Sequence, residues 1–406
     1  MAEKTKPVLL FAAALCYNKI TSKKLAHKGV IIMNTAKWVA VWGSAPSYTA
    51  PSPCRYAKDV TLHYNIRAML SGKRVRLHLN NLYGKEDAVI TRMFIGAEGK
   101  NILPVTFGGE TACSLPAGAQ VVSDEIDFAL VRGEDYFVSF YLGDMTPLHC
   151  GTNDTGPLCC FTYAEGDHAQ EYVLPAFHTT TTDTAFFLDT IDVLTDDNDA
   201  HAAVCFGDSI TAQAWPDYLM LRVLREEREH LSVIRRGIGG SRVLRQYETL
   251  LNRHYGSKGH ARFEREISAA GVDRVIILHG INDIIHPNGT TYRPWSDLPT
   301  AEELIDGLRW YVNKAHELGK KVYLATIMPI KGWSTYNEQR NDIRMAVNAW
   351  IRSQTESDGY VDFDKANQDP SEPLQLLPLY DKGDHLHPSW PGAENMAESV
   401  PAAYLD

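Results

Sequence analysis

Four short segments in the second half of the chain carry the groups that serine-ester chemistry needs. Gly207-Asp208-Ser209-Ile210 supplies a hydroxyl, and Asp384-His385-Leu386-His387-Pro388 supplies a carboxylate and an imidazole three residues apart. Gly239-Gly240 and Gly280-Ile281-Asn282-Asp283 supply N–H groups that can stabilise an oxyanion. One such segment means little by itself. Their joint occurrence, each beside a strand-like run, indicates an acyl-transfer site.

Ser209 is the candidate nucleophile, because a tight turn after a strand can lift its hydroxyl to the edge of a sheet. A serine needs an adjacent base, and His387 is the candidate, with Asp384 fixing its tautomer. Two alternatives stay open: Ser209 as a helix N-cap only, and His385 as the base. A metal site at Asp384, His385 and His387 ranks low, because no further ligand follows at a recognisable spacing.

The developing oxyanion requires preorganised donors. We expect these to be the backbone N–H of Ser209, the backbone N–H of Gly240 and the side-chain amide of Asn282. The plainer alternatives are that Gly239-Gly240 is only a turn and that Asn282-Asp283 only caps a helix.

Length and charge limit the classes of protein to consider. A chain of 406 residues favours two domains, and a net charge of -10 gives no basic field for nucleic acid. No apolar run reaches the length of a membrane span. Val8 to Cys16 has the length of a signal-peptide core, but its flanks do not fit an export signal. We expect residues 1–32 to be an extension outside the folded core.

The seven cysteines form an odd set without metal-type spacing. We expect Cys159 and Cys160 to be two separate thiols, because a disulfide between neighbours is strained, and Cys205 to be a small core residue. This pattern favours a reduced, cytoplasmic setting.

Residues 33–196 have the pattern of an all-β sandwich. Val75, Leu77 and Leu79 alternate with polar residues, and strand-like runs recur at 89–95, 126–131 and 136–142 between Gly and Pro. The boundary is expected near Asp196. Residues 197–406 alternate strands with helices and so predict a parallel α/β sheet.

In this second part the expected strands are 202–206, 231–234, 275–278, 322–327 and 361–363. The expected helices are 215–229, 340–352, 391–404 and one that opens at the capping box Thr300-Ala301-Glu302-Glu303 and ends before Gly319. Sites in such sheets lie beyond the carboxyl ends of the strands, where all four motifs fall.

Gly-Asp-Ser-Ile-Thr at 207–211, Gly-Ile-Gly-Gly at 237–240, Gly-Ile-Asn-Asp at 280–283 and Asp-x-x-His-Pro at 384–388 resemble the four blocks of the SGNH (GDSL-type) hydrolase family. The resemblance spans about Ala202 to Ala402. It implies a flavodoxin-like, three-layer α/β/α domain and ester hydrolysis without a cofactor or metal. It also implies that Ser209 is the nucleophile, Gly240 and Asn282 are oxyanion donors, and Asp384 and His387 complete the triad.

The β-rich part, beginning at Trp38-Val39-Ala40-Val41-Trp42, resembles the two-domain branch in which a jelly-roll-like domain precedes the hydrolase. Many members of that branch are esterases of plant polysaccharide breakdown. The resemblance therefore implies a carbohydrate or other small ester as substrate, with acetyl as the acyl group. Two departures are the His385-Leu386 pair, where Gly-Ile or Gly-Leu is common, and the lack of a clear export signal.

Two other functions stay open: a lipolytic esterase or thioesterase for longer acyl chains, and a carbohydrate-binding protein with an inactive hydrolase domain. Four aromatic residues follow motifs or strand ends and are candidates for pocket walls or for the core: Trp215, Trp333, Tyr336 and Tyr380. The oligomeric state is not determined by the sequence.

Overall fold

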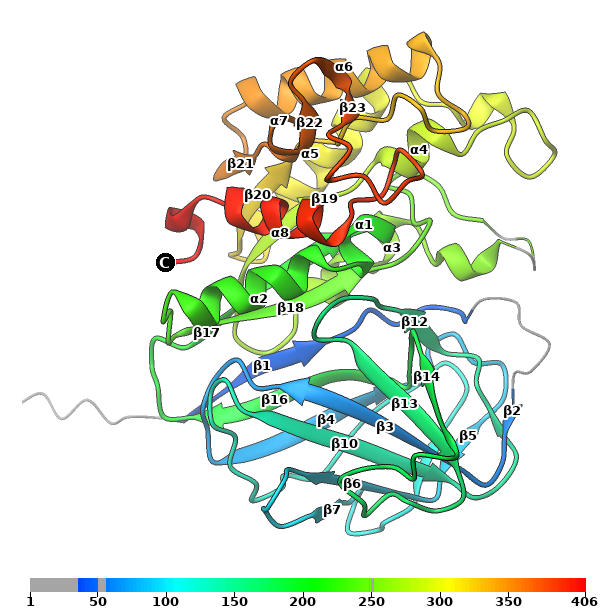
Figure 1. The fold of residues 1–406 in the computed structure, drawn as a ribbon, viewed down its shortest axis with the longest axis vertical. Coiled ribbons are helices and arrows are strands. Elements are labelled where there is room, and N and C mark those ends of the chain that lie inside the picture. Colours follow the sequence, from blue (N-terminus) through cyan, green and yellow to red (C-terminus); the bar gives the residue numbers. More distant parts are fainter. Residues whose placement is uncertain (1–35, 50–55, 248, 250–251) are drawn as a thin grey trace, which may run out of the picture. The chain divides into compact units, whose positions relative to one another are not determined.

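The first half of the chain folds into antiparallel sheets, as its alternating pattern predicts (Figure 1). The computed structural model of the protein describes residues 36–49, 56–247, 249 and 252–406. One sheet has the order β1-β16-β4-β9 and another β14-β13-β3-β10-β6-β7. Their strands are β1 (Lys37–Gly43), β16 (Leu188–Thr195), β4 (Arg74–Asn80), β9 (Gln120–Val122), β14 (Thr179–Thr182), β13 (Cys160–Glu165), β3 (Val60–Arg67), β10 (Asp135–Leu142), β6 (Arg92–Gly96) and β7 (Leu103–Val105). Short pairs join β2 (Tyr56–Ala57) to β11 (Thr146–Pro147), β5 (Ala88–Ile90) to β8 (Cys113–Leu115) and β12 (Gly151–Asn153) to β15 (Thr184–Phe186).

The core of this β part is built from the apolar faces of its strands. Val75, Leu77 and Leu79 on β4 are fully buried, which confirms the alternation. Tyr64 on β3 stacks edge-on against Phe140, with ring centroids 5.0 Å apart, and its hydroxyl accepts a hydrogen bond from the backbone N–H of Phe186.

Two strand predictions in the β part need correction. The run 126–131 is not a strand, because it pairs only through the isolated bridges Val75 to Ile126 and Gly72 to Leu130. The run 89–95 is two strands, β5 and β6, which pair with different partners on either side of Thr91.

The second half forms a five-stranded parallel sheet of order β18-β17-β19-β20-β21. Numbered along the chain, this is 2-1-3-4-5, the flavodoxin-like order. The strands are β17 (His201–Gly207), β18 (Leu231–Gly237), β19 (Val272–Leu278), β20 (Lys321–Ala325) and β21 (Gly359–Val361). Each overlaps an expected strand, and β18 runs three residues further than predicted, from Ile234 to Gly237. The last prediction, 361–363, was displaced: β21 shares only Val361 with it, because a helix begins at Phe363.

Helices cover both faces of this sheet (Figure 1). They are α1 (Ser209–Ala212), α2 (Trp215–Arg225), α3 (Gly259–Ile267), α4 (Ile281–Ile285), α5 (Ala301–Glu317), α6 (Glu338–Ser353), α7 (Phe363–Asn367) and α8 (Trp390–Ser399), and a short antiparallel pair, β22 (Gln368–Asp369) and β23 (Glu372–Leu376), follows α7. Phe206 on β17 packs against Phe263 of α3 and Tyr311 of α5, with ring centroids 5.0 and 5.5 Å away. On the other face, Arg222 of α2 donates to the carbonyls of Ala397 and Glu398 on α8.

Helix ends follow the expected chemistry with two differences. Thr300 and Glu303 form the predicted capping box of α5, and Gly319 follows the helix with φ +69°. The closing helix is shorter than 391–404: α8 ends at Ser399, because Pro401 lacks an N–H and disfavours helix in the residue before it. The helix from Trp215 ends at Arg225, and Glu227 takes a positive φ of 53°.

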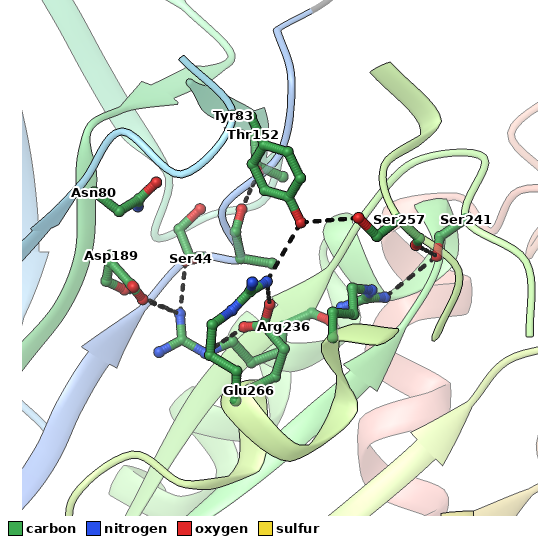
Figure 2. Close-up of polar contacts among 12 residues, drawn as sticks. Ser44, Asn80, Tyr83, Thr152, Asp189, Arg236, Ser241, Ser257 and Glu266 are labelled. Atoms are coloured by element: carbon green, nitrogen blue, oxygen red, sulfur yellow. Dashed lines mark hydrogen bonds and ion pairs between the residues drawn. The ribbon is translucent and has the colours of Figure 1, made fainter. Parts of the chain in front are cut away.

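Buried ionic contacts connect the β part to the parallel sheet. Arg236 on β18 donates to the Ser44 and Asp189 carbonyls, at 2.6 and 3.0 Å, and forms ion pairs with the carboxylates of Asp189 and Glu266. Figure 2 shows this guanidinium between the two acids, with Tyr83 and Ser257 further along the same polar chain. The described residues belong to one compact unit. The domain boundary near Asp196 stays a prediction.

The described cysteines are free thiols: Cys113, Cys150, Cys159, Cys160 and Cys205. Cys159 and Cys160 are thus separate, and Cys205 is buried, as expected. Cys16, Cys54, the run Val8 to Cys16 and the extension 1–32 lie outside the described residues. Within the described ranges, no helix has the length and apolar character to cross a membrane.

Candidate active site

The candidate site lies where the carboxyl ends of β17 and β19 meet, the point at which the strand order of the sheet reverses. Ser209 begins α1 directly after β17, and the Asp208 carboxylate caps this turn by accepting from the Ile210 N–H. Gly207 is required here, since a Cβ on it would lie 2.2 Å from the Leu278 carbonyl oxygen. The close approach of β17 and β19 therefore fixes where Ser209 emerges.

The structure brings Ser209, His387 and Asp384 together. Ser209 Oγ lies 2.9 Å from His387 Nε2, and His387 Nδ1 lies 2.6 Å from Asp384 Oδ2. The other oxygen of Asp384 accepts from the backbone N–H groups of Leu386 and His387, at 3.0 and 2.8 Å. The carboxylate thus holds both the ring and the loop that carries it.

These contacts keep Asp384 ionised. Partial burial acts to raise its pKa, but the hydrogen bonds from the His387 ring and from the two backbone N–H groups outweigh burial and hold the pKa well below its usual value. A permanent negative charge beside Nδ1 favours the tautomer that leaves Nε2 free to accept a proton.

His385 is placed elsewhere. Its Nδ1 lies 2.6 Å from Asp381 Oδ2, its side chain is 52% exposed, and its backbone has a φ of 64°. His385 and His387 therefore form two separate histidine–aspartate pairs, and only the second reaches Ser209.

The three residues expected to supply oxyanion donors lie along one cavity. A Cβ on Gly239 would lie 3.9 Å from Ser209 Cβ, and Gly240 has a φ of 79° with the ring of Tyr255 packed against it. The Asn282 amide is buried and donates to the Ser241 carbonyl at 3.0 Å. Ser209, Gly240 and Asn282 all line the same cavity.

Two residues whose roles the sequence analysis missed hold the segments around the candidate site in place. The Asp283 carboxylate accepts from the N–H groups of Val243 and Leu244, at 2.8 and 3.0 Å, and so ties α4 to the chain after Gly240. Fully buried Arg262 donates to the Gly207 carbonyl at 2.6 Å and to the Arg236 carbonyl at 3.1 Å, which holds the ends of β17 and β18 together. The Gly-Ile-Asn-Asp motif already contained Asp283, but nothing local to Arg262 indicated its role.

A cavity of about 500 Å³ opens over Ser209. The parallel sheet and its loops supply Ile238, Tyr255, Ile285, His286, Asn288, Arg293, Trp333 and Thr335 to its lining, and the β part supplies Ser47, Tyr48, Gly151, Thr152 and Asn153. The β part is thus one wall of the candidate site, a contribution that the sequence did not reveal.

Of the four candidate aromatics, Trp333 is the one found in this lining, with its ring centroid 6.4 Å from that of His387. Trp215 is a core residue: it is fully buried, packs against Phe363 and donates to Thr211 Oγ1. Tyr336 and Tyr380 are not part of the described lining.

This arrangement defines a serine ester hydrolase on a flavodoxin-like sheet. Residues 205–394 match the model of the GDSL-like Lipase/Acylhydrolase family. The structure is consistent with the predicted two-domain organisation, because the residues before this match form mostly antiparallel strands.

Several crystal structures are similar to part of the chain. A GDSL-like lipase from Bacteroides thetaiotaomicron is 19% identical, over 50% of this chain and 86% of its own, with a TM-score of 0.36. An acetylxylan esterase from Geobacillus stearothermophilus is 22% identical, over 49% of this chain and 91% of its own, with a TM-score of 0.36. A Bacteroides fragilis protein classed as an acylhydrolase is 20% identical over 52% and 90% of the two chains, with a TM-score of 0.39. A comparison of the sequence with curated proteins found no match.

Proposed function

We propose that Ser209, His387 and Asp384 are the catalytic triad of this carboxylic-ester hydrolase. The observation that carries the proposal is the unbroken hydrogen-bonded line from Ser209 Oγ through His387 to Asp384, at 2.9 and 2.6 Å. Both distances lie within the range over which a positioned base accepts a proton.

The reaction proceeds in two steps. Ser209 Oγ attacks the ester carbonyl while His387 Nε2 takes the hydroxyl proton, and the imidazolium is stabilised by Asp384. The carbonyl oxygen becomes an oxyanion, which accepts from the N–H groups of Ser209 and Gly240 and from the Asn282 amide. His387 returns its proton to the leaving alcohol, and an acyl-enzyme remains. Water, deprotonated by the same imidazole, then releases the acid and restores Ser209.

We propose a short acyl group, acetyl first, on a carbohydrate or similar small alcohol. A cavity of about 500 Å³ with Thr152, Asn153 and Asn288 in its lining supports a small polar substrate. Rates measured over a series of acyl lengths test this point, because a maximum at medium chains would favour a lipolytic esterase instead.

The triad is tested by Ser209→Ala and by labelling with an aryl phosphonofluoridate. Turnover of 4-nitrophenyl acetate should be lost in the variant with its melting temperature kept, and intact-mass analysis should show one adduct on the wild type and none on the variant. Ser114→Ala, an exposed serine on β8, is the matched control and should behave as wild type. Near-normal turnover by Ser209→Ala would remove Ser209 from its role.

A further inference from the structure

The permanently charged side chain in the described lining of the cavity is positive. The described lining contains one guanidinium, that of Arg293, and neither an aspartate nor a glutamate. The chain as a whole has the opposite balance, with 50 acidic against 40 basic residues. A guanidinium with no carboxylate in the same lining favours a negatively charged group locally.

Arg293 is held in place by neutral partners. Its guanidinium lies over the rings of Tyr247 and Tyr255, 5.6 and 5.7 Å from their centroids. Its Nη2 donates only long hydrogen bonds, 3.5 Å to Asn252 Oδ1 and 3.4 Å to the Tyr255 hydroxyl. Among the described residues, no carboxylate forms an ion pair with it. Nearby Arg242, by contrast, is neutralised by Asp297 at 3.1 Å.

Two further basic residues lie at the cavity, one charged and one neutral. A second guanidinium, that of Arg253, lies 5.1 Å from the ring centroid of Tyr48, another cavity residue. His286 in the lining has its pKa lowered to about 3, first by burial and then by the nearby charges of Arg293, Arg242 and Arg340. His286 is therefore neutral and leaves the cationic role to Arg293.

Arg293 is also joined to the candidate oxyanion loop. The ring of Tyr255, over which the Arg293 guanidinium lies, packs on Gly240. A Cβ on Gly240 would lie 2.1 Å from Tyr255 Cδ1. A group bound by Arg293 would thus sit on the Gly240 side of the cavity, within the same space that opens over Ser209.

We propose that Arg293 binds a negatively charged group of the substrate, so that the ester cleaved at Ser209 is an ester of an acidic compound such as an acylated uronic acid. This inference rests on the proposed function. Arginine suits the role, because its planar fork donates two parallel hydrogen bonds to a carboxylate and its face stacks on aromatic rings.

The test compares substrates that differ only in charge. For the alcohol side, the pair is an O-acetylated methyl hexuronide with a free carboxylate and its uncharged carboxamide. For the acyl side, the pair is 4-nitrophenyl hemisuccinate and its carboxamide. In one of these pairs the wild type should prefer the carboxylate by roughly 10- to 100-fold in kcat/KM, mainly through KM, as expected for a charge-assisted hydrogen bond.

Arg293→Gln should bring that preference close to one, and Arg293→Lys should keep part of it. Arg309→Gln is the matched control. The Arg309 guanidinium also lies over an aromatic ring, 5.5 Å from the ring centroid of Trp350, but Arg309 is on α5 and is not among the residues that line the cavity. It should keep the wild-type preference. A phosphonofluoridate adduct on each variant shows that its site is still folded.

The inference would be overturned if the wild type preferred neither carboxylate substrate. It would also be overturned if Arg293→Gln kept the wild-type preference. Hydrolysis of 4-nitrophenyl acetate separates this failure from that of the proposed function. An enzyme that cleaves the neutral ester but ignores charge leaves the triad standing, whereas one that cleaves no ester and takes no adduct refutes the triad itself.

Discussion

Replacing Arg236 with methionine should strongly destabilise the protein. Arg236 is 2% exposed and joins β18 to the β part through three hydrogen bonds, to the Ser44 carbonyl, the Asp189 carbonyl and the Thr190 hydroxyl. Its ion pairs with Asp189 and Glu266 are 3.0 and 3.3 Å long. Methionine fills much of the volume but satisfies none of these groups.

The magnitude follows from the two acids left behind. Asp189 keeps Gln120 and Thr190 as partners, and Glu266 keeps Arg265 at 2.7 Å, so neither becomes wholly unpaired. Removing one member of a buried ion pair costs about 3–5 kcal/mol in general. Because the acids keep these neutral and charged partners, we expect about 3 kcal/mol, still a large share of the roughly 5–15 kcal/mol that stabilises a typical protein.

Urea unfolding followed by tryptophan fluorescence measures this loss. Arg74→Met is the matched control: Arg74 also pairs with two acids, Glu125 and Asp127, but is 47% exposed, so its loss should cost much less than that of Arg236. Adding Asp189→Asn to Arg236→Met should recover part of the stability, because it removes one uncompensated charge. Equal effects of Arg236→Met and Arg74→Met, or no recovery in the double variant, would refute this reasoning.

Three further predictions concern the site. Asn282→Ala should lower kcat roughly 10²- to 10³-fold if its amide meets the oxyanion, and a small effect in steady-state kinetics would leave it as a brace for Ser241 only. His385→Ala should be mild and His387→Ala severe, because only the latter ring contacts Ser209; equal losses would show that the wrong imidazole was chosen. Burial raises the pKa of Asp208 to about 7, so the folded protein holds a proton that the unfolded chain releases, and stability falls as the pH rises from about 4 to about 7. Asp208→Asn, which can still cap α1, should therefore gain more stability relative to wild type at about pH 8 than at about pH 5 in the same unfolding assay, and a gain independent of pH would exclude this titration.

The sequence predicted the parallel sheet well because buried parallel strands are continuous apolar runs. The runs 202–206 and 275–278 are such strands, and the Ser209 and Asn282 motifs follow them directly, so the place of the site followed from the place of the strands. The end of β18 was missed for the opposite reason. Arg235 and Arg236 look like a polar boundary, yet both are buried within the strand.

The acidic residues that stabilise the buried Arg235 and Arg236 are distant in sequence. Arg235 pairs with Asp217 of α2, and Arg236 pairs with Asp189 of the β part and Glu266 of α3. The local sequence pattern cannot reveal such ion pairs. An arginine is expected at the surface unless the acidic residue that pairs with it is known. The same limit hid Tyr48 and Asn153, which reach the cavity from strands and loops that have no motif of their own.

The proposal of His387 rather than His385 as the base rests on contacts that the motif alone does not reveal. Asp381 lies only four residues before His385, and its carboxylate accepts from both the backbone N–H and the ring of that histidine. Asp384 does the same for His387. One loop therefore holds two similar pairs, and only their orientation in the fold separates them.

The β part is connected to the candidate active site by a chain of polar contacts. The chain that begins at Asp189 and Arg236 continues through Glu266, Arg265 and Tyr83 to Ser257 (Figure 2). The Ser257 carbonyl accepts from Ser241, whose own carbonyl receives the Asn282 amide. The contacts that fasten the β part thus end at a candidate oxyanion donor. Because the β part also forms one wall of the cavity, substitutions at that wall can alter which substrates fit while the triad stays unchanged.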